Sequence, residues 1–164
     1  MDGIYLLLGT NMGDKFLQLK IAKRQINEQI GAIVKQSSIY KTAAWGEEDQ
    51  DSFLNQVVKV QSKLGPLKIL DKIAIIEAAM GRERKGKWKE RIIDIDILYY
   101  HNQVIATEKL HIPHKELQNR NFALAPLAEI ASGEIHPVFQ KTQKELHEQC
   151  TDQLEVIMLP PEHS

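Results

Sequence analysis

The stretch RIIDIDILYY, residues 91–100, combines the composition of a buried β-strand with aspartates at two alternate positions. Successive side chains of a strand point to opposite faces, so Asp94 and Asp96 share one face. The other face is apolar and carries Ile93, Ile95, Ile97 and Tyr99. The carboxylates lie about 7 Å apart along the strand and, at an effective dielectric of about 20, repel by roughly 2–3 kcal/mol. A purely structural strand gains nothing from this repulsion, so the pattern predicts a positive group between the aspartates.

The segments around this strand alternate between strand and helix signals. Apolar residues at helical spacing predict helices over 14–30, before Gly31, and over 66–80, opened by Pro66. Segments rich in β-branched and aromatic residues predict the remaining strands, at 4–9, 32–42, 53–62 and 104–107. Through residue 100 the order is β-α-β-β-α-β, the ferredoxin-like pattern. We therefore predict an α+β fold in which helices pack on an antiparallel sheet.

The C-terminal part adds helical segments at 114–131 and 141–150 to this core. The last residues, LPPEHS, are expected to fray, as chain ends do. No repeat or low-complexity linker divides the sequence. The chain is thus predicted to be a single domain over 1–164 with a loosely held tail at 151–164.

Composition and charge narrow the classes of protein. The 164 residues are 43% hydrophobic and 26% charged, which is ordinary for a globular domain with its own core. A formal net charge of −1 gives no global electrostatic case for binding nucleic acid or an anionic membrane. Cys150 is the single cysteine, which fits a reducing compartment. With no signal peptide or bilayer-length apolar run, we expect a cytoplasmic protein without an obligate protein partner.

The segment RERKGKWKER, residues 82–91, is strongly basic and runs directly into the aspartate pair. Mg²⁺ takes oxygen ligands and usually combines one or two carboxylates with substrate phosphates. Arginine and lysine neutralise the phosphate oxygens that a metal does not reach. The combination therefore predicts a Mg²⁺–polyphosphate site, with a solvated charged loop as the alternative. Residues 9–15 read GTNMGDK and lack a Walker A ending, so a nucleotide would be bound by another scheme.

The tetrapeptide HIPH, residues 111–114, places two histidines close together. No cysteine and no third histidine stand at ligand spacing, so zinc is not expected. His114 follows a proline and either caps a turn or donates to a phosphate. Arg120 would add a further positive charge to those of the basic segment 82–91.

Taken together, the chain resembles the 6-hydroxymethyl-7,8-dihydropterin pyrophosphokinase family of folate biosynthesis over roughly residues 4–139. The matching segments are LLLGTNMGD, SSIYKT, FLNQVV, IEAAMGR, RIIDIDIL and IPHKELQNRNFALAPL. The last two, in this order, are the specific ones. The resemblance implies transfer of pyrophosphate from ATP to the hydroxymethyl group of 6-hydroxymethyl-7,8-dihydropterin, which yields the pterin diphosphate and AMP. It also implies two Mg²⁺ ions as cofactors.

The resemblance further implies the site residues. Asp94 and Asp96 hold the metal and, with Arg82 and Arg91, form the catalytic set. The ATP-binding set is Glu77, Arg82, Arg84, Trp88, Arg91, Ile97, His114 and Arg120. The pterin-binding set is Thr42, Trp45, Phe53, Asn55 and Phe122. Two aromatic faces suit a flat heterocycle, and an amide can donate and accept along its edge. Core packing is the alternative for the two phenylalanines.

The sequence departs from the family pattern at three places. Lys89 and Glu90 stand where the family usually has Gly-Pro, Ala43 follows Thr42 where a proline is common, and Lys115 replaces a frequent aromatic residue. None of these changes removes a predicted metal ligand.

Two rival functions are open at this point. A Mg²⁺-dependent phosphatase or nucleotidyltransferase would also use paired aspartates, but it would not need two phenylalanines and an asparagine. A ferredoxin-like RNA-binding module would use exposed aromatic side chains. The acidic pair in the sheet and the net charge of −1 argue against RNA binding.

Overall fold

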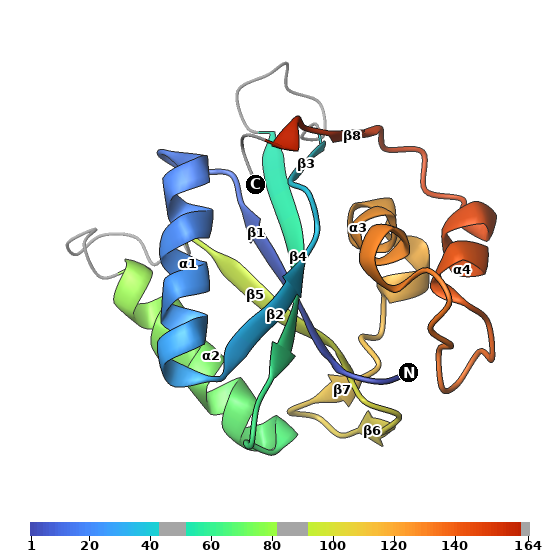
Figure 1. Ribbon diagram of the computed structural model, residues 1–164, viewed down its shortest axis with the longest axis horizontal. Coiled ribbons are helices and arrows are strands. Elements are labelled where there is room, and N and C mark those ends of the chain that lie inside the picture. Colours follow the sequence, from blue (N-terminus) through green and yellow to red (C-terminus); the bar gives the residue numbers. More distant parts are fainter. Residues whose placement is uncertain (43–51, 82–91, 162–164) are drawn as a thin grey trace.

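The structure, a computed structural model, describes residues 1–42, 52–81 and 92–161. Its sheet lies between two pairs of helices (Figure 1). The sheet strands are β1 (Ile4–Thr10), β2 (Ala32–Gln36), β3 (Tyr40–Thr42), β4 (Phe53–Gln61), β5 (Asp94–Tyr100) and β8 (Val156–Met158). The helices are α1 (Lys15–Gln29), α2 (Pro66–Gly81), α3 (Asn121–Ala131) and α4 (Gln143–Gln149), with a 3₁₀ turn at Leu117–Asn119.

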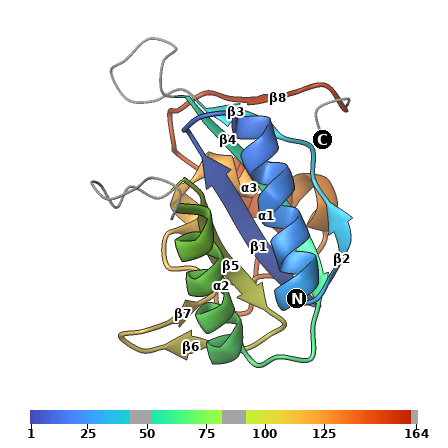
Figure 2. The same cartoon turned by 90° about the vertical axis from the view of Figure 1, so that its left-hand side faces the viewer.

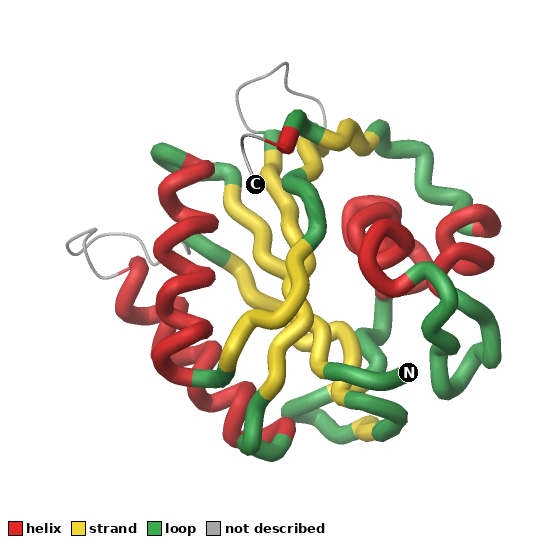
Figure 3. The backbone as a smooth tube through the Cα atoms, viewed as in Figure 1, coloured by secondary structure: helices red, strands yellow, loops and turns green. Residues whose placement is uncertain are grey.

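The sheet order is β5-β1-β4-β3-β8, and β2 also pairs with β4. Every pairing in this sheet is antiparallel. From β1 to β5 the elements follow the predicted β-α-β-β-α-β order, except that the one strand predicted at 32–42 is divided into β2 and β3, and the α+β prediction is confirmed. The predicted strand at 104–107 is β6 (Ile105–Ala106), which pairs with β7 (His111–Ile112) as a separate hairpin (Figure 3).

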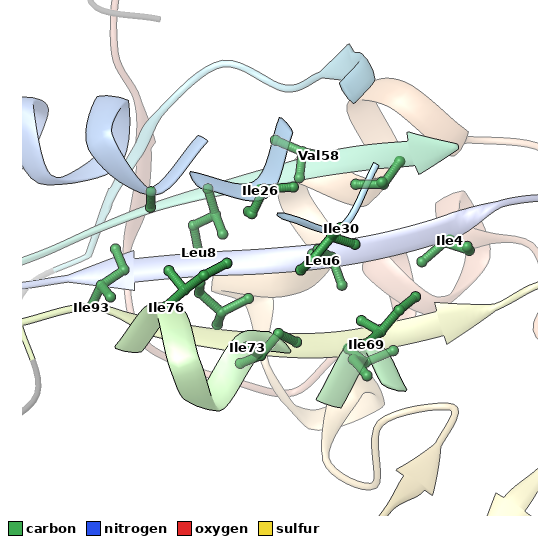
Figure 4. Packing of buried hydrophobic residues seen from close by; sticks show 14 of the residues in the cluster. Ile4, Leu6, Leu8, Ile26, Ile30, Val58, Ile69, Ile73, Ile76 and Ile93 are labelled. Atoms are coloured by element: carbon green, nitrogen blue, oxygen red, sulfur yellow. The ribbon is translucent and has the colours of Figure 1, made fainter. Parts of the chain in front are cut away.

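Helices α1 and α2 cover one face of the sheet (Figure 2). Their buried residues Ile26 and Ile76 pack against alternate residues of β1, among them Leu6 and Leu8 (Figure 4). Asp14 caps the N-terminus of α1, because its carboxylate accepts a hydrogen bond from the backbone N–H of Leu17 at 3.1 Å. This face forms the larger hydrophobic core.

Helices α3 and α4 cover the opposite face, where the intervening residues of β1 point (Figure 1). Tyr5 and Leu7 pack there against Leu124 and Leu127. The next residue of β1 on this face is Gly9, which has no side chain to fill the space. The second core therefore ends at Gly9.

A bulge in β5 changes the direction of Tyr99. Tyr5 pairs with Tyr99 but Leu6 pairs with Ile97, so Leu98 is an extra residue in the strand. Leu98 and Tyr99 both belong to the core under α3, whereas Ile97 packs toward α1 and α2. The prediction that Tyr99 shares a face with the isoleucines was wrong, because strict alternation does not survive a bulge.

The predicted strand at 32–42 is interrupted between β2 and β3. Ser37 replaces regular pairing at this point: its backbone N–H donates to the Val57 carbonyl at 2.9 Å, and its hydroxyl accepts from the Val57 N–H at 3.0 Å. Helix α3 likewise starts later than the predicted 114–131, because the 3₁₀ turn precedes it. Helix α4 agrees with the predicted 141–150 and begins with a capping box at Thr142.

The C-terminal segment differs from the expected loose tail. Strand β8 pairs with the outer edge of β3, and the Leu159 N–H donates to the Ile39 carbonyl at 2.8 Å. Before it, the Asp152 carboxylate accepts a hydrogen bond from the backbone N–H of Asn121, the first residue of α3, at 3.0 Å. The outer edge of β3 has backbone N–H and C=O groups that need hydrogen-bond partners, and residues 156–158 provide these partners. Within the described ranges no helix is long and apolar enough to cross a bilayer.

Candidate active site

A cavity of about 440 Å³ opens between the sheet and the N-terminus of α3. Its volume is in the range of small-molecule sites. Its lining residues come from four strands, α3 and the C-terminal segment: Leu7, Gly9, Thr42, Phe53, Asn55, Asp94, Asp96, Arg120, Phe122 and Leu154. Seven predicted site residues are therefore brought together: Thr42, Phe53, Asn55, Asp94, Asp96, Arg120 and Phe122.

The register of three strands explains this assembly. Gly9 on β1 pairs with Asn55 on β4 and with Asp94 on β5, so the three residues form one row across the sheet. Neighbouring strands are about 4.8 Å apart, which separates the backbones of Asn55 and Asp94 by about 10 Å. The amide and the carboxylates thus occupy opposite sides of one cavity.

Because Gly9 has no side chain, the Asn55 amide can occupy the space above β1. A Cβ atom at Gly9 would lie 2.7 Å from Oδ1 of Asn55, closer than such atoms pack. Any larger residue at position 9 would therefore displace the amide from its place over β1.

The Asn55 side of the cavity is polar but buried. Asn55 and Thr42 are each 4% exposed. The Thr42 hydroxyl oxygen has no hydrogen-bond partner within the described part of the structure. An unpaired buried polar group costs about 1–3 kcal/mol. A bound molecule with a polar edge would remove that cost.

The two phenylalanines add apolar surface to this side. Phe53 starts β4 and Phe122 lies in the first turn of α3. Phe122 is partly buried and packs against the core under α3. Phe122 also lines the cavity, so it contributes both to the core under α3 and to the cavity wall.

The carboxylate side combines Asp94, which is exposed, with Asp96, which is half-buried. Among the described residues, no cluster of three or more His, Cys, Asp or Glu side chains is placed to hold a metal by itself. Two carboxylates on one strand face provide hard oxygen ligands and leave most coordination positions to substrate and water. This donor set fits Mg²⁺.

Arg120 and His114 lie next to the carboxylates. The Arg120 guanidinium is 5.6 Å from the centre of the Phe122 ring, within cation–π distance. Burial lowers the pKa of His114, Asp96 acts to raise it, and Arg120 acts to lower it. His114 Nδ1 accepts a hydrogen bond from the Glu116 N–H at 3.1 Å. This contact leaves Nε2 to carry the proton of the neutral ring, so His114 is a hydrogen-bond donor.

Three of the predicted ATP-binding residues that the structure describes lie outside the cavity lining: His114, Ile97 and Glu77. Ile97 is buried in the core on the α1–α2 side, so its side chain points away from the cavity. Glu77 lies on α2, and its Oε2 accepts a hydrogen bond from the backbone N–H of Ile95 at 2.9 Å. Their roles toward a nucleotide stay predictions.

Five other predicted residues lie outside the described residues. They are Trp45, Arg82, Arg84, Trp88 and Arg91. Conversely, the sequence reasoning missed Leu7, Gly9 and Leu154 as lining residues. For Gly9 the sequence did contain an indication, since this glycine stands between strand and loop in LLLGTNMGD. Leu154 had none, because only the pairing of β8 brings the C-terminal segment to the cavity.

Comparison with known proteins gives a consistent assignment. The sequence model of the family described as 7,8-dihydro-6-hydroxymethylpterin-pyrophosphokinase matches residues 5–132. A 2-amino-4-hydroxy-6-hydroxymethyldihydropteridine pyrophosphokinase of Aquifex aeolicus is 41% identical over 151 residues, which are 92% of this chain and 94% of that protein. The protein of the same name from Bacillus subtilis is 39% identical over 150 residues, 91% of this chain and 85% of that protein.

A solved structure supports the fold. The Plasmodium falciparum HPPK-DHPS protein, crystallised with SDX-DHP, matches with a TM-score of 0.73 at 20% identity. The match covers 90% of this chain but only 43% of that longer one.

Proposed function

The chain belongs to the 7,8-dihydro-6-hydroxymethylpterin-pyrophosphokinase family, and we infer that it transfers pyrophosphate from ATP to 6-hydroxymethyl-7,8-dihydropterin in folate biosynthesis. The hydroxymethyl oxygen forms a bond to the β-phosphorus of ATP. The bond between that phosphorus and the oxygen bridging to the α-phosphate breaks, and AMP leaves with the electron pair. The hydroxyl proton is released, so the products are the pterin diphosphate and AMP.

One observation carries the assignment of the site: a single cavity has an amide and aromatic rings on one side and a carboxylate pair on the other. We propose that the pterin lies against Phe53 and Phe122, with its polar edge toward Asn55 and Thr42. The buried Thr42 hydroxyl, which has no hydrogen-bond partner among the described residues, supports this placement, because the amino and carbonyl groups of a pterin would satisfy it. Trp45 is proposed to join this side from the segment after Thr42.

Enzymes of this family use ATP and typically Mg²⁺, and the carboxylate side of the cavity fits such a metal. We propose that Asp94 and Asp96 hold two Mg²⁺ ions together with the ATP phosphates. When bound, the metal supplies Lewis-acid chemistry, which neutralises phosphate charge and lowers the pKa of the attacking hydroxyl.

The chain's own cations would complete the neutralisation. Arg120 is at the cavity wall, and the Nε2–H of His114 is a donor suited to a phosphate oxygen. The resemblance adds Arg82, Arg84 and Arg91, with Trp88 and Ile97 as further ATP contacts. Donors positioned where negative charge develops stabilise the transition state. Metal, positioning and electrostatics can suffice in phosphoryl-type transfer, so the proposal needs no protein general base.

The location and partners of the protein follow from this function. We propose a cytoplasmic enzyme that acts on two small molecules and requires no nucleic acid, membrane or obligate protein partner.

The nucleotide product tests the proposal. The protein is incubated with ATP, Mg²⁺ and 6-hydroxymethyl-7,8-dihydropterin, and nucleotides are separated by ion-exchange chromatography. Formation of AMP in equal amount to pterin consumed is expected. Release of ADP and phosphate, or of pyrophosphate, would instead support the Mg²⁺-dependent phosphatase or nucleotidyltransferase alternative.

A further inference from the structure

Two hydrogen bonds fix the backbone on either side of Asp94. The first comes from Thr10, whose hydroxyl donates to the carbonyl of Ile92 at 2.7 Å. Thr10 is 2% exposed, so this bond is shielded from water. Thr10 follows Gly9 on β1 and therefore points to the face opposite the cavity, beneath the carboxylates.

The second hydrogen bond comes from Glu77 at the other side of Asp94. Oε2 of Glu77, near the C-terminal end of α2, accepts from the Ile95 N–H at 2.9 Å. In the described sheet β5 pairs only with β1, so β5 is an edge strand. An edge strand leaves alternate N–H groups without a strand partner, and Glu77 satisfies the one between Asp94 and Asp96.

These two hydrogen bonds hold the end of β5 that carries Asp94 and Asp96. Asp94 is the first residue of β5, and its pairing with Gly9 is the terminal pair of the ladder. Residues at the end of an edge strand have few backbone constraints, and the repulsion between Asp94 and Asp96 favours their separation. A metal site works best when its ligands are held in place before the metal arrives.

We propose that Thr10 and Glu77 are positioning residues that hold Asp94 and Asp96 in the arrangement that binds Mg²⁺ with ATP. The inference rests on the proposed function, since it presumes the metal role of the aspartates. Neither Thr10 nor Glu77 lines the cavity, so both act through the backbone of β5. For Glu77 this differs from the direct nucleotide contact that the family resemblance implies.

Substitutions that remove or keep each hydrogen bond test the proposal. Thr10→Val and Glu77→Met remove the hydroxyl and the acceptor at similar side-chain size, whereas Thr10→Ser and Glu77→Gln keep them. The readout is the affinity for Mn²⁺ in the presence of a non-hydrolysable ATP analogue, measured by electron paramagnetic resonance. Loss of a group that orients a metal ligand typically costs about 10–100-fold in affinity. We expect such a loss for Thr10→Val and Glu77→Met, and near wild-type affinity for Thr10→Ser and Glu77→Gln.

Ser62 offers a matched control far from the cavity. Its hydroxyl donates to the Ile30 carbonyl at 2.6 Å and accepts from the Leu64 N–H at 3.1 Å. Thr10 makes the same two kinds of contact, with Ile92 at 2.7 Å and the Met12 N–H at 3.4 Å. Ser62→Ala is expected to lower the melting temperature and leave Mn²⁺ affinity unchanged. Amide hydrogen exchange at Ile95 in metal-free protein should accelerate in Glu77→Met but not in Ser62→Ala.

Wild-type Mn²⁺ affinity in both Thr10→Val and Glu77→Met would overturn the proposal. An equal loss of affinity in Ser62→Ala would also overturn it, because the effect would then reflect general destabilisation. Asp96→Asn distinguishes failure of the metal site from failure of the proposed function. If Asp96→Asn binds Mn²⁺ like wild type, neither the metal site nor the positioning role holds. If Mn²⁺ binding depends on Asp96 but no AMP is formed, the proposed function fails, and the Thr10 and Glu77 variants still decide the positioning role.

Discussion

Asn55 and Asp94 lie in one row across the sheet, each paired in register with Gly9 between them. This row defines the two sides of the cavity. Asn55 belongs to a buried side with aromatic rings, and Asp94 belongs to a charged side that suits a metal and phosphates. Substitutions on the two sides should therefore have separable effects on the two substrates.

Replacing Asp96 tests the charged side. Asp96→Asn is expected to abolish turnover while the protein stays folded, because a metal ligand is lost but no core contact is removed. The melting temperature should be unchanged or slightly raised, since the repulsion between Asp94 and Asp96 disappears. Activity assays and thermal unfolding check this, with the exposed Asp71→Asn on α2 as a control. Near-normal turnover, or unfolding of the Asp96 variant, would contradict the assignment.

Replacing Thr42 by valine tests the buried hydroxyl. Valine has nearly the same shape, so Thr42→Val leaves no hole and removes a polar group that has no hydrogen-bond partner in the described part of the chain. Removing such a group is expected to stabilise the ligand-free protein by up to about 1–3 kcal/mol. Pterin affinity should fall, because the proposed partner of the heterocycle is lost. Thermal unfolding with and without pterin measures both effects; a variant that is less stable and binds pterin normally would show that the hydroxyl has another role.

A methyl group at Gly9 tests how the amide is placed. Gly9→Ala puts a Cβ atom 2.7 Å from Oδ1 of Asn55, so the amide must move. Pterin affinity should fall at least about tenfold, which corresponds to about 1.4 kcal/mol. Gly133→Ala is the control, because a Cβ there meets nothing within 4 Å. Equal pterin affinities in the two variants would refute the role of Gly9.

Titration of His136 is expected to make the free energy of unfolding depend on pH. Its buried Nδ1 accepts hydrogen bonds from the N–H groups of Val138 and Phe139, both at 3.1 Å. Burial lowers the pKa of His136 to about 4. The unfolded chain, with a histidine pKa of about 6.5, binds this proton more readily than the folded chain between these two values. The stabilising contribution is therefore present above about pH 6.5 and is lost as the pH falls toward about 4, with a slope of up to about 1.4 kcal/mol per pH unit.

Denaturant unfolding between pH 4 and pH 8 measures this slope. His136→Asn keeps a side-chain acceptor but cannot titrate, so its stability should vary less with pH over this interval. His147→Asn on α4 serves as the control. An identical pH dependence in wild type and His136→Asn would exclude His136 as the source.

The sequence predicted the parts of the fold that depend on local pattern. Helix α1 agrees with its predicted range because apolar spacing, an aspartate cap and Gly31 all specify it. The direction of Tyr99 was not predictable, because the extra residue Leu98 is defined only by the pairing of β5 with β1. Strand β8 was missed because three residues are too few to show a period, and β3 supplies the reason for its pairing.

The same distinction applies to the candidate site. Asp94 and Asp96 were recognisable because two carboxylates in an apolar strand are costly without a ligand. Phe53 and Phe122 could not be separated from core residues by sequence alone, and the structure shows that Phe122 contacts the core and the cavity together. Leu154 reaches the cavity only through tertiary pairing, which no local pattern encodes.

We propose that one cavity holds pterin on the Asn55 side and metal with ATP on the Asp96 side. Calorimetric titration of Asn55→Ala and Asp96→Asn tests it most directly, each with pterin and with a Mg²⁺–ATP analogue. We expect Asn55→Ala to weaken pterin binding about tenfold or more, since an unpaired polar edge costs about 1–3 kcal/mol, and to leave nucleotide binding unaffected. Asp96→Asn should weaken the nucleotide and leave pterin binding alone. Equal losses of both ligands in both variants, or normal pterin affinity in Asn55→Ala, would contradict it.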